Sequence, residues 1–231
     1  MDISILNTPL FGLILTISAF HIGLFVFKKT KFPIFNPLLI GIVIAMGVMS
    51  FFNIPLDYFR RGGDYMTFLL APATISLALP LYKQLDKLKQ NFLPIIIGSL
   101  VGAATAIVST ILLGKLLGID KLLLVSFMPK SITTPIGIEL SKLLGGVPAI
   151  TIFAIIVTGI VGNVLAPAVC KCFKIKHPVA KGIGIGISSH AVGTSKALEM
   201  GEVEGAMSAL SIVVSGIITF LIAPLFIFLI S

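Results

Sequence analysis

Long apolar runs separated by short polar stretches make up most of the chain. Two continuous runs come first, Leu6 to Phe27 and Asn36 to Phe52. Others cover Phe92 to Leu113, Val147 to Val169 and Ala206 to Ile230. An α-helix crosses a bilayer with about 20 apolar residues, whereas the strands of a membrane barrel are about half as long. The pattern therefore predicts spanning helices and an all-α, polytopic membrane helix bundle.

A further predicted span, Tyr65 to Tyr82, is interrupted by Pro72 and Pro80. The basic connector Lys83 to Lys89 follows it.

The segment from Lys121 to Leu144 contains a polar interruption, MPKSITTPIG, in which Pro129 and Pro135 would each break the helical hydrogen-bond ladder. Non-helical backbone persists at membrane depth only where it is buried in protein or lines a wet cavity. The termini of the helical runs on either side of the interruption would then lie close together. A helix N-terminus there offers unpaired N–H groups and the positive end of the helix dipole to an anion. Hydroxyls could cap the freed ends, and a lysine adds charge; these candidate residues are Lys130, Ser131, Thr133 and Thr134.

Lys130 has two interpretations. A lysine within the membrane is costly and therefore functional by default, whereas one at the interface only extends its ammonium group toward water. The sequence leaves both open. Glu139, in the same element, is a possible intramembrane acid.

A second polar, glycine-rich stretch begins at Gly186 and reads GISSHAVGTSKALEMGEVEG. His190 could bind a carboxylate or relay a proton near neutral pH, or its ring could be satisfied by neighbouring backbone. Lys196 and Glu199 are spaced for a local ion pair. The candidate site residues of this stretch are Ser189, His190, Thr194 and Ser195, of which the last two could cap the helix that follows. The glycines that alternate nearby permit close helix packing or a kink; they are Gly182, Gly184 and Gly186.

Two broken, polar elements about 60 residues apart are typical of a transporter whose site lies at a pair of discontinuous helices. Short similarities between segments of the chain also favour a transporter, because transporters often contain internal repeats. NPLLIGIVIAMG from Asn36 is similar to HPVAKGIGIGIS from His177, and LAPATISLALP from Leu70 is similar to FMPKSITTPIG from Phe127. These similarities predict a possible internal repeat.

Composition supports a membrane protein, because hydrophobic residues make up 57% of the chain and charged residues only 11%. A soluble domain carries about 25% charged residues. We expect one integral membrane domain over residues 1–231. The first run is too long for a signal peptide and has no basic segment before it, so we expect it to be a retained span. The net charge of +8 comes mainly from lysines at span ends, which favours anionic lipid over nucleic acid as the partner.

Lysine positions bear on topology. By the positive-inside rule Lys28 to Lys31 and Lys83 to Lys89 are cytoplasmic, although Arg60 and Arg61 then fall outside. The next cluster, Lys171 to Lys181, is also cytoplasmic only if one intervening segment does not cross. A re-entrant hairpin over Lys121 to Leu144 satisfies this condition, and a discontinuous spanning helix is the alternative.

The sequence offers little for catalysis. Lys130 and Ser131 are adjacent, so in a helix their side chains point apart, and no oxyanion signature accompanies them. Cys170 and Cys172 would form a strained bridge and are too few for a structural metal site. We expect no enzyme activity, no catalytic residues, no metal and no cofactor.

Three stretches of the chain resemble the LrgB/CidB family of bacterial inner-membrane proteins. They are MPKSITTPIGIELSKLLGG, GNVLAPAV and SSHAVGTSKALEMGEVEGAMS. The resemblance implies an antiholin-like regulator of murein hydrolase export that works with a small membrane protein of the LrgA/CidA type. It also implies small carboxylates as substrates, because related proteins move pyruvate in bacteria, and glycolate and glycerate in the plastid envelope. Distant similarity to the cation-antiporter and anion-transporter superfamily agrees with discontinuous helices.

Two hypotheses follow. In the first, the protein is a multi-pass carrier of small carboxylates in the bacterial inner (cytoplasmic) membrane, and the candidate residues of both broken elements form one midplane site. In the second, it is an antiholin-like or holin-like protein that controls lysis through oligomerisation and an LrgA-type partner. In either case we expect a homo-oligomer, such as a dimer.

Overall fold

The computed structural model describes residues 3–30, 35, 37–76, 82 and 85–230. Over these residues the chain is helical and forms no strand, which confirms the predicted all-α class. The chain divides into two compact units, Met1–Ala78 and Leu79–Ser231, which we describe separately. The expectation of one domain over residues 1–231 stays a prediction.

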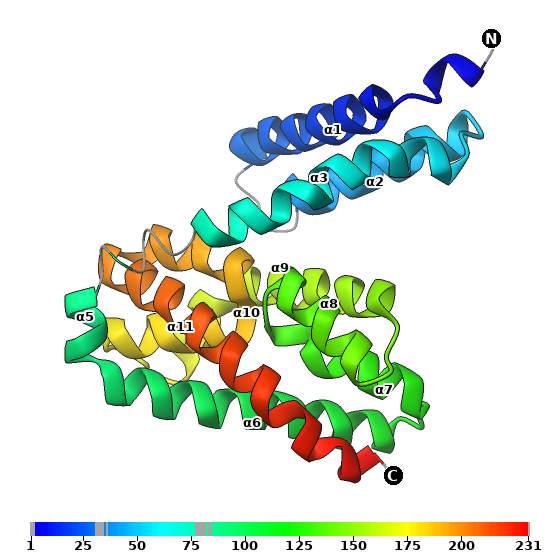
Figure 1. The fold of residues 1–231 in the computed structure, drawn as a ribbon. Helices are drawn as coiled ribbons and strands as arrows, with labels where there is room; N and C mark the ends of the chain where they lie inside the picture. The colour runs from blue at the N-terminus through cyan, green and yellow to red at the C-terminus, as the bar shows by residue number, and fades with distance from the viewer. Residues whose placement is uncertain (1–2, 31–34, 36, 77–81, 83–84, 231) are drawn as a thin grey trace. The chain divides into compact units, whose positions relative to one another are not determined.

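Unit 1 contains the 3₁₀ turn η1 (Ile3–Leu6) and helices α1 (Pro9–Thr30), α2 (Pro37–Phe51) and α3 (Leu56–Ser76) (Figure 1). Helix α1 packs on both other helices. Glycines make the close approach to α3 possible, because a Cβ added at Gly62 would lie 2.5 Å from the Leu13 nitrogen. Small residues at such crossings let helix backbones come together in a membrane.

The first two predicted spans match α1 and α2, but the predicted start of the third, Tyr65, is wrong. Helix α3 begins nine positions earlier, at Leu56 directly after Pro55, and includes Arg60 and Arg61. The reason is that helical hydrogen bonds join backbone groups and continue through exposed, charged side chains, which a hydropathy pattern excludes. Pro72 lies inside α3. Residues 77–81 and 83–84 lie outside the described part of the chain. They include Pro80, part of the predicted basic connector and part of the internal similarity that begins at Leu70.

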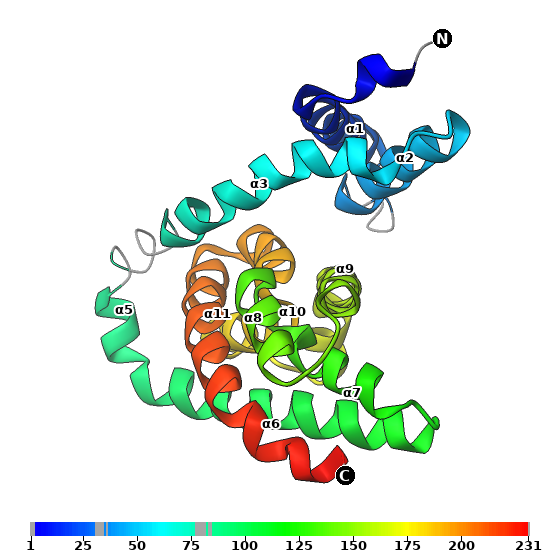
Figure 2. The same cartoon turned by 45° about the vertical axis from the view of Figure 1, so that its right-hand side comes forward.

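Unit 2 begins with the short helix α5 (Leu85–Gln90) and the long helix α6 (Phe92–Leu116). The first broken element follows as α7 (Lys121–Phe127), η3 (Met128–Ser131) and α8 (Thr134–Leu143). The chain then continues through α9 (Pro148–Cys172), α10 (Pro178–Met200), α11 (Glu202–Ile222) and the 3₁₀ segment η4 (Ala223–Ile230). Helices α6 and α11 cross each other in both views (Figures 1 and 2).

Within the described residues, four helices are long and apolar enough to cross a membrane, namely Pro9–Thr30, Phe92–Leu116, Pro148–Cys172 and Glu202–Ile230. Their outward faces carry exposed apolar side chains such as Leu112, Phe153 and Leu221. Water would make such faces costly, whereas lipid accepts them. The protein is therefore a multi-pass membrane protein.

Two buried clusters hold unit 2 together. The larger one packs the first broken element against α6 and the C-terminal segment, through Ile107, Ile111, Leu124, Val125, Met128, Ile132, Leu140, Ala223 and Ile230. The second joins α6, α10 and α11 through Ile95, Ile183, Ile187, Ala206, Met207 and Leu210. Both clusters position the broken elements against continuous helices, and the candidate site lies between them.

Candidate functional site

The first broken element breaks where its prolines predict. Asp120 starts α7 by accepting a hydrogen bond from the Leu123 N–H at 3.0 Å. Pro129 lies in the 3₁₀ turn, and Ile132 and Thr133 are extended. Pro135 lies in the first turn of α8, where the N–H that proline lacks would have no helical partner. The interruption is thus a turn between two short helices.

The hydroxyl at the start of α8 does not cap it, which corrects the sequence-based expectation. Thr133 occupies the N-cap position, but its side chain makes no capping hydrogen bond. Its Oγ1 is buried, and no partner for it occurs among the described residues.

The two arms of this element fold back on each other. The Thr151 hydroxyl of α9 lies 2.7 Å from the Ser126 carbonyl oxygen of α7 and 2.7 Å from the Ser141 Oγ of α8. Ser126 Oγ also accepts a hydrogen bond from the Val147 N–H at 2.8 Å. Because one side chain reaches both arms, α7, η3 and α8 form a helical hairpin whose tip is Met128–Ser131, which we call the first hairpin.

Helix α10 is also sharply folded. His190 has φ 41° and ψ −139°, which no α-helix contains. A Cβ at Gly182 would lie 2.5 Å from the Glu204 carbonyl oxygen, and a Cβ at Gly205 would lie 3.0 Å from the Leu198 Cα. Gly182 and Leu198 would be about 24 Å apart in a straight helix, yet both touch the first turn of α11. Helix α10 therefore forms a second hairpin, with its tip at His190.

A cavity of about 760 Å³ lies between α6, the tip of the first hairpin and the first arm of α10. Lys130 and Ser131 line it from the tip, and Ser188 lines it from α10. The Lys130 Nζ lies 3.4 Å from the Ser131 Oγ, and the lysine is half-buried. The described lining contains no carboxylate, so the ammonium group faces mostly apolar walls from Gly98, Val101, Gly102, Ala106, Ile183 and Ile187.

His190 is turned away from this cavity. Its Nε2 donates to the Ile155 carbonyl oxygen of α9 at 2.9 Å, and the residue is only 4% exposed. A Cβ at Gly159 would lie 2.6 Å from the His190 Cε1, so this glycine leaves room for the ring. Of the two interpretations of His190, this geometry favours a ring satisfied by neighbouring backbone.

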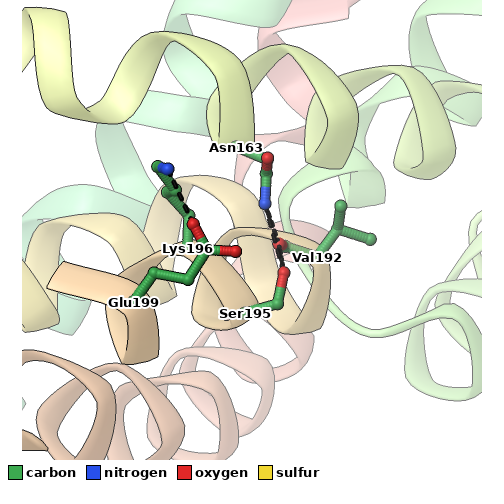
Figure 3. A network of polar contacts seen from close by, with 5 residues as sticks. All are labelled: Asn163, Val192, Ser195, Lys196 and Glu199. Carbon is green, nitrogen blue, oxygen red and sulfur yellow. Dashed lines mark hydrogen bonds and ion pairs between the residues drawn. The ribbon is translucent and has the colours of Figure 1, made fainter. Parts of the chain in front are cut away.

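The second arm of α10 is held by hydroxyls and one amide. Thr194 Oγ1 donates to the His190 carbonyl oxygen at 2.9 Å and lies 2.7 Å from the Ser208 Oγ of α11. Figure 3 shows Asn163 of α9 reaching this arm: its Nδ2 donates to the Val192 carbonyl oxygen at 2.8 Å and to the Ser195 Oγ at 3.1 Å. The bonds from Asn163 tie the second arm to α9, and the contact with Ser208 ties it to α11.

Two acid–base pairs near the hairpins are local ion pairs, and only one of them was predicted. Lys196 and Glu199 lie 2.7 Å apart, which confirms the pair that their spacing predicts (Figure 3). Glu139 is paired with Lys142 at 2.8 Å, and both side chains are more than half exposed. Glu139 therefore lies on an outer face of the first hairpin and not in the cavity.

One face of α9 contacts both hairpins, which the sequence did not reveal. Thr151, Ile155, Gly159 and Asn163 are each four residues apart and so lie on one side of the helix. Thr151 bonds the first hairpin, while the other three contact or bond α10 near His190. The available signal was the spacing of small and polar residues inside an apolar run.

The candidate residues thus fall into three groups. Lys130 and Ser131 line the large cavity, together with Ser188, which was not among the predicted site residues. Ser189 lines a neighbouring cavity of about 590 Å³ between α9 and α10. The others line neither cavity; they are Thr133, Thr134, His190, Thr194 and Ser195. That all of them form one site stays a prediction.

Comparison with known proteins identifies the family. Residues 16–229 match the LrgB-like family. The chain belongs to this family. It is 37% identical over 220 residues to proteins named antiholin-like protein LrgB from Bacillus mycoides, Bacillus cereus and Bacillus anthracis. The match covers 95% of this chain and 96% of each relative. No solved structure gives a significant match.

Membership of the LrgB-like family confirms the resemblance drawn from MPKSITTPIGIELSKLLGG and the two other motifs. The matched residues include both hairpins, α9 and the cavity between them. The name of these relatives describes them as antiholin-like and says nothing of a substrate.

Proposed function

We propose that this protein is a carrier for small carboxylates in the bacterial cytoplasmic membrane. The observation that supports the proposal is a lysine, Lys130, at the tip of a helical hairpin, lining a cavity of about 760 Å³ whose described walls hold no carboxylate. This volume is within the range of about 300–1,000 Å³ typical of small-molecule sites. An anion in the cavity would supply the counter-charge that the site lacks.

The chemistry suits a small carboxylate. The Lys130 ammonium group would donate to one carboxylate oxygen, and the Ser131 and Ser188 hydroxyls could donate to the other. Mostly apolar walls strengthen such charge-assisted hydrogen bonds because they exclude water. In this proposal the tip of the second hairpin is held in place by Ser189, His190, Thr194 and Ser195. Thr133 and Thr134 directly follow the tip of the first hairpin in sequence.

We further propose that both hairpins are re-entrant. Helices α6 and α9 separate the lysines before Phe92 from those after Cys172, and two crossings bring both groups to the cytoplasmic side only if the first hairpin does not cross. The first hairpin then enters from outside, and the α10 hairpin from the cytoplasm. Their tips meet α9 at depth, where irregular backbone is tolerated around a cavity.

A second candidate function is that of an antiholin-like regulator of murein hydrolase export. The names of the relatives favour this function over transport, whereas the cavity favours transport. In this case the protein would act as a homo-oligomer or together with a small LrgA-type membrane protein. A substrate cavity would then have no role, and activity would depend on assembly.

Uptake of labelled pyruvate and glycolate into proteoliposomes distinguishes the two functions. We expect saturable uptake that falls about 10- to 100-fold in Lys130→Gln, because one charge-assisted hydrogen bond of about 1.5–3 kcal/mol is lost. The matched control is Lys142→Gln, an exposed lysine of the same hairpin, which should leave uptake unchanged. Equal uptake by both variants contradicts the site at Lys130, and a lack of saturable uptake by the unchanged protein contradicts the carrier. Leak of unrelated solutes that grows with oligomer size supports the antiholin-like function.

A further inference from the structure

The cavity that Ser189 lines continues outward as a groove between α9 and α10. One wall is a ridge of α9 formed by Val157, Val161, Leu165 and Val169, which are four residues apart and 41–48% exposed. Exposed valine and leucine along a spanning helix face lipid and not water. The ridge is about 18 Å long at about 1.5 Å per residue. That length is close to one leaflet of a hydrocarbon core about 30 Å thick.

The groove opens at one end into a basic pocket of about 370 Å³. Cys170, Ile175 and Lys181 line both, so the two hollows adjoin each other. The pocket is built by the turn after α9, where the Ile175 N–H donates to the Cys170 carbonyl oxygen at 2.8 Å and Lys174 adopts φ 54°. This tight reversal brings together four lysines, which are Lys171, Lys174, Lys176 and Lys181.

The charge of this pocket is largely uncompensated. Lys181 lies 3.8 Å from Glu204 Oε1. Lys171, Lys174 and Lys176 form no ion pair with any carboxylate in the described part of the chain. Lys171, Lys174 and Lys176 are exposed at or just after the end of a spanning helix, at the level where lipid headgroups lie.

We propose that this groove and pocket form a binding site for an anionic glycerophospholipid. Its phosphate lies among the four lysines, and one acyl chain lies along the ridge of α9. Basic pockets between spanning helices recognise anionic headgroups in this way. The groove matches an acyl chain in length and polarity, and the positive charge of the pocket complements the negative charge of the headgroup. The groove shares Ala180, Gly184 and Ser188 with the lining of the cavity at Lys130, but the lipid proposal does not depend on the transport proposal.

Native mass spectrometry of the full chain in detergent, titrated with phosphatidylglycerol or phosphatidylcholine, tests the site. We expect phosphatidylglycerol to bind more tightly. The double variant Lys174→Gln/Lys176→Gln should weaken phosphatidylglycerol binding about 25-fold, because each lysine near an anionic headgroup strengthens binding about fivefold. The matched control, Lys28→Gln/Lys29→Gln at the end of α1, should have no effect. Equal affinity for both lipids, or equal loss in both double variants, overturns the proposal.

A second pair of variants tests the groove itself. Val161→Trp fills it and should lower phosphatidylglycerol binding several-fold, whereas Leu112→Trp, on the exposed face of α6, should not. Glycerol phosphate, which has the headgroup charge without acyl chains, should compete only weakly. If glycerol phosphate competes at a concentration equal to that of the lipid, the ligand is a free anion, and this result also overturns the proposal. Circular dichroism of each variant verifies that its helices are intact.

Discussion

Thr151 connects three elements through a single hydroxyl group. It is fully buried, near the start of a helix that the sequence marks only as apolar, and it touches both arms of the first hairpin. A buried polar group stabilises a fold when its partners are satisfied and costs free energy when one of them is left alone. Thr151 therefore fixes the closed form of the hairpin that carries Lys130.

Replacing Thr151 by valine tests this role. The change keeps the shape of the side chain but leaves the Ser126 carbonyl and the Ser141 hydroxyl without this partner, so we expect a loss of about 1–3 kcal/mol in the free energy of unfolding. Thr16→Val is the control, because the Thr16 hydroxyl bonds only the Gly12 carbonyl of its own helix. Reversible unfolding in mixed micelles measures both variants, and an equal loss in each contradicts the role of Thr151.

At the scale of elements, the hairpin of α10 depends on which glycines face a neighbour. Gly182 and Gly186 lie against the α11 backbone at Glu204 and Ser208, with no room for a Cβ. Gly184 lies between them in sequence, but a Cβ there would meet nothing within 4 Å. Of the two sequence interpretations, close packing is therefore observed at Gly182 and Gly186, and the kink lies further on, at His190.

Alanine at these positions should give opposite results. Gly186→Ala places a methyl group against the Ser208 carbonyl, so α10 and α11 must separate, and we expect a destabilisation of about 1–3 kcal/mol. Gly184→Ala should be neutral or stabilising by up to about 1 kcal/mol, because alanine favours the helix over glycine. Thermal unfolding in detergent compares the two variants. A Gly184→Ala protein as unstable as Gly186→Ala contradicts this packing.

At the scale of the whole molecule, the arrangement of hairpins determines topology. The first hairpin begins and ends on the same side in our proposal, since its two arms meet at Thr151. A discontinuous spanning helix would instead place its two ends on opposite sides of the membrane. The lysine clusters agree with the hairpin, because it keeps Lys171 to Lys181 cytoplasmic.

Cysteine labelling decides between these topologies. In a Cys170→Ser/Cys172→Ser background, we expect Leu117→Cys and Leu143→Cys, both exposed positions, to react from outside with an impermeant maleimide. Lys176→Cys should react only after the membrane is opened. Labelling of positions 117 and 143 from opposite sides identifies a spanning helix and contradicts the re-entrant hairpin.

The sequence by itself determined the features that depend on local chemistry. Runs of apolar residues located α1, α2, α6 and α9, because spanning a bilayer requires a minimum apolar length. Pro129 and Pro135 located the first break, since proline cannot continue a helical ladder. The motifs around these breaks also indicated the LrgB-like family.

Only the tertiary structure decided which polar residues act together. It joined Lys130 to Ser188 in one cavity, turned His190 onto Ile155 and showed that α9 contacts both hairpins. These relations depend on contacts through space between residues far apart in the chain, and a local pattern does not encode them. The start of α3 was missed for a related reason, because backbone hydrogen bonds extend a helix beyond its apolar residues.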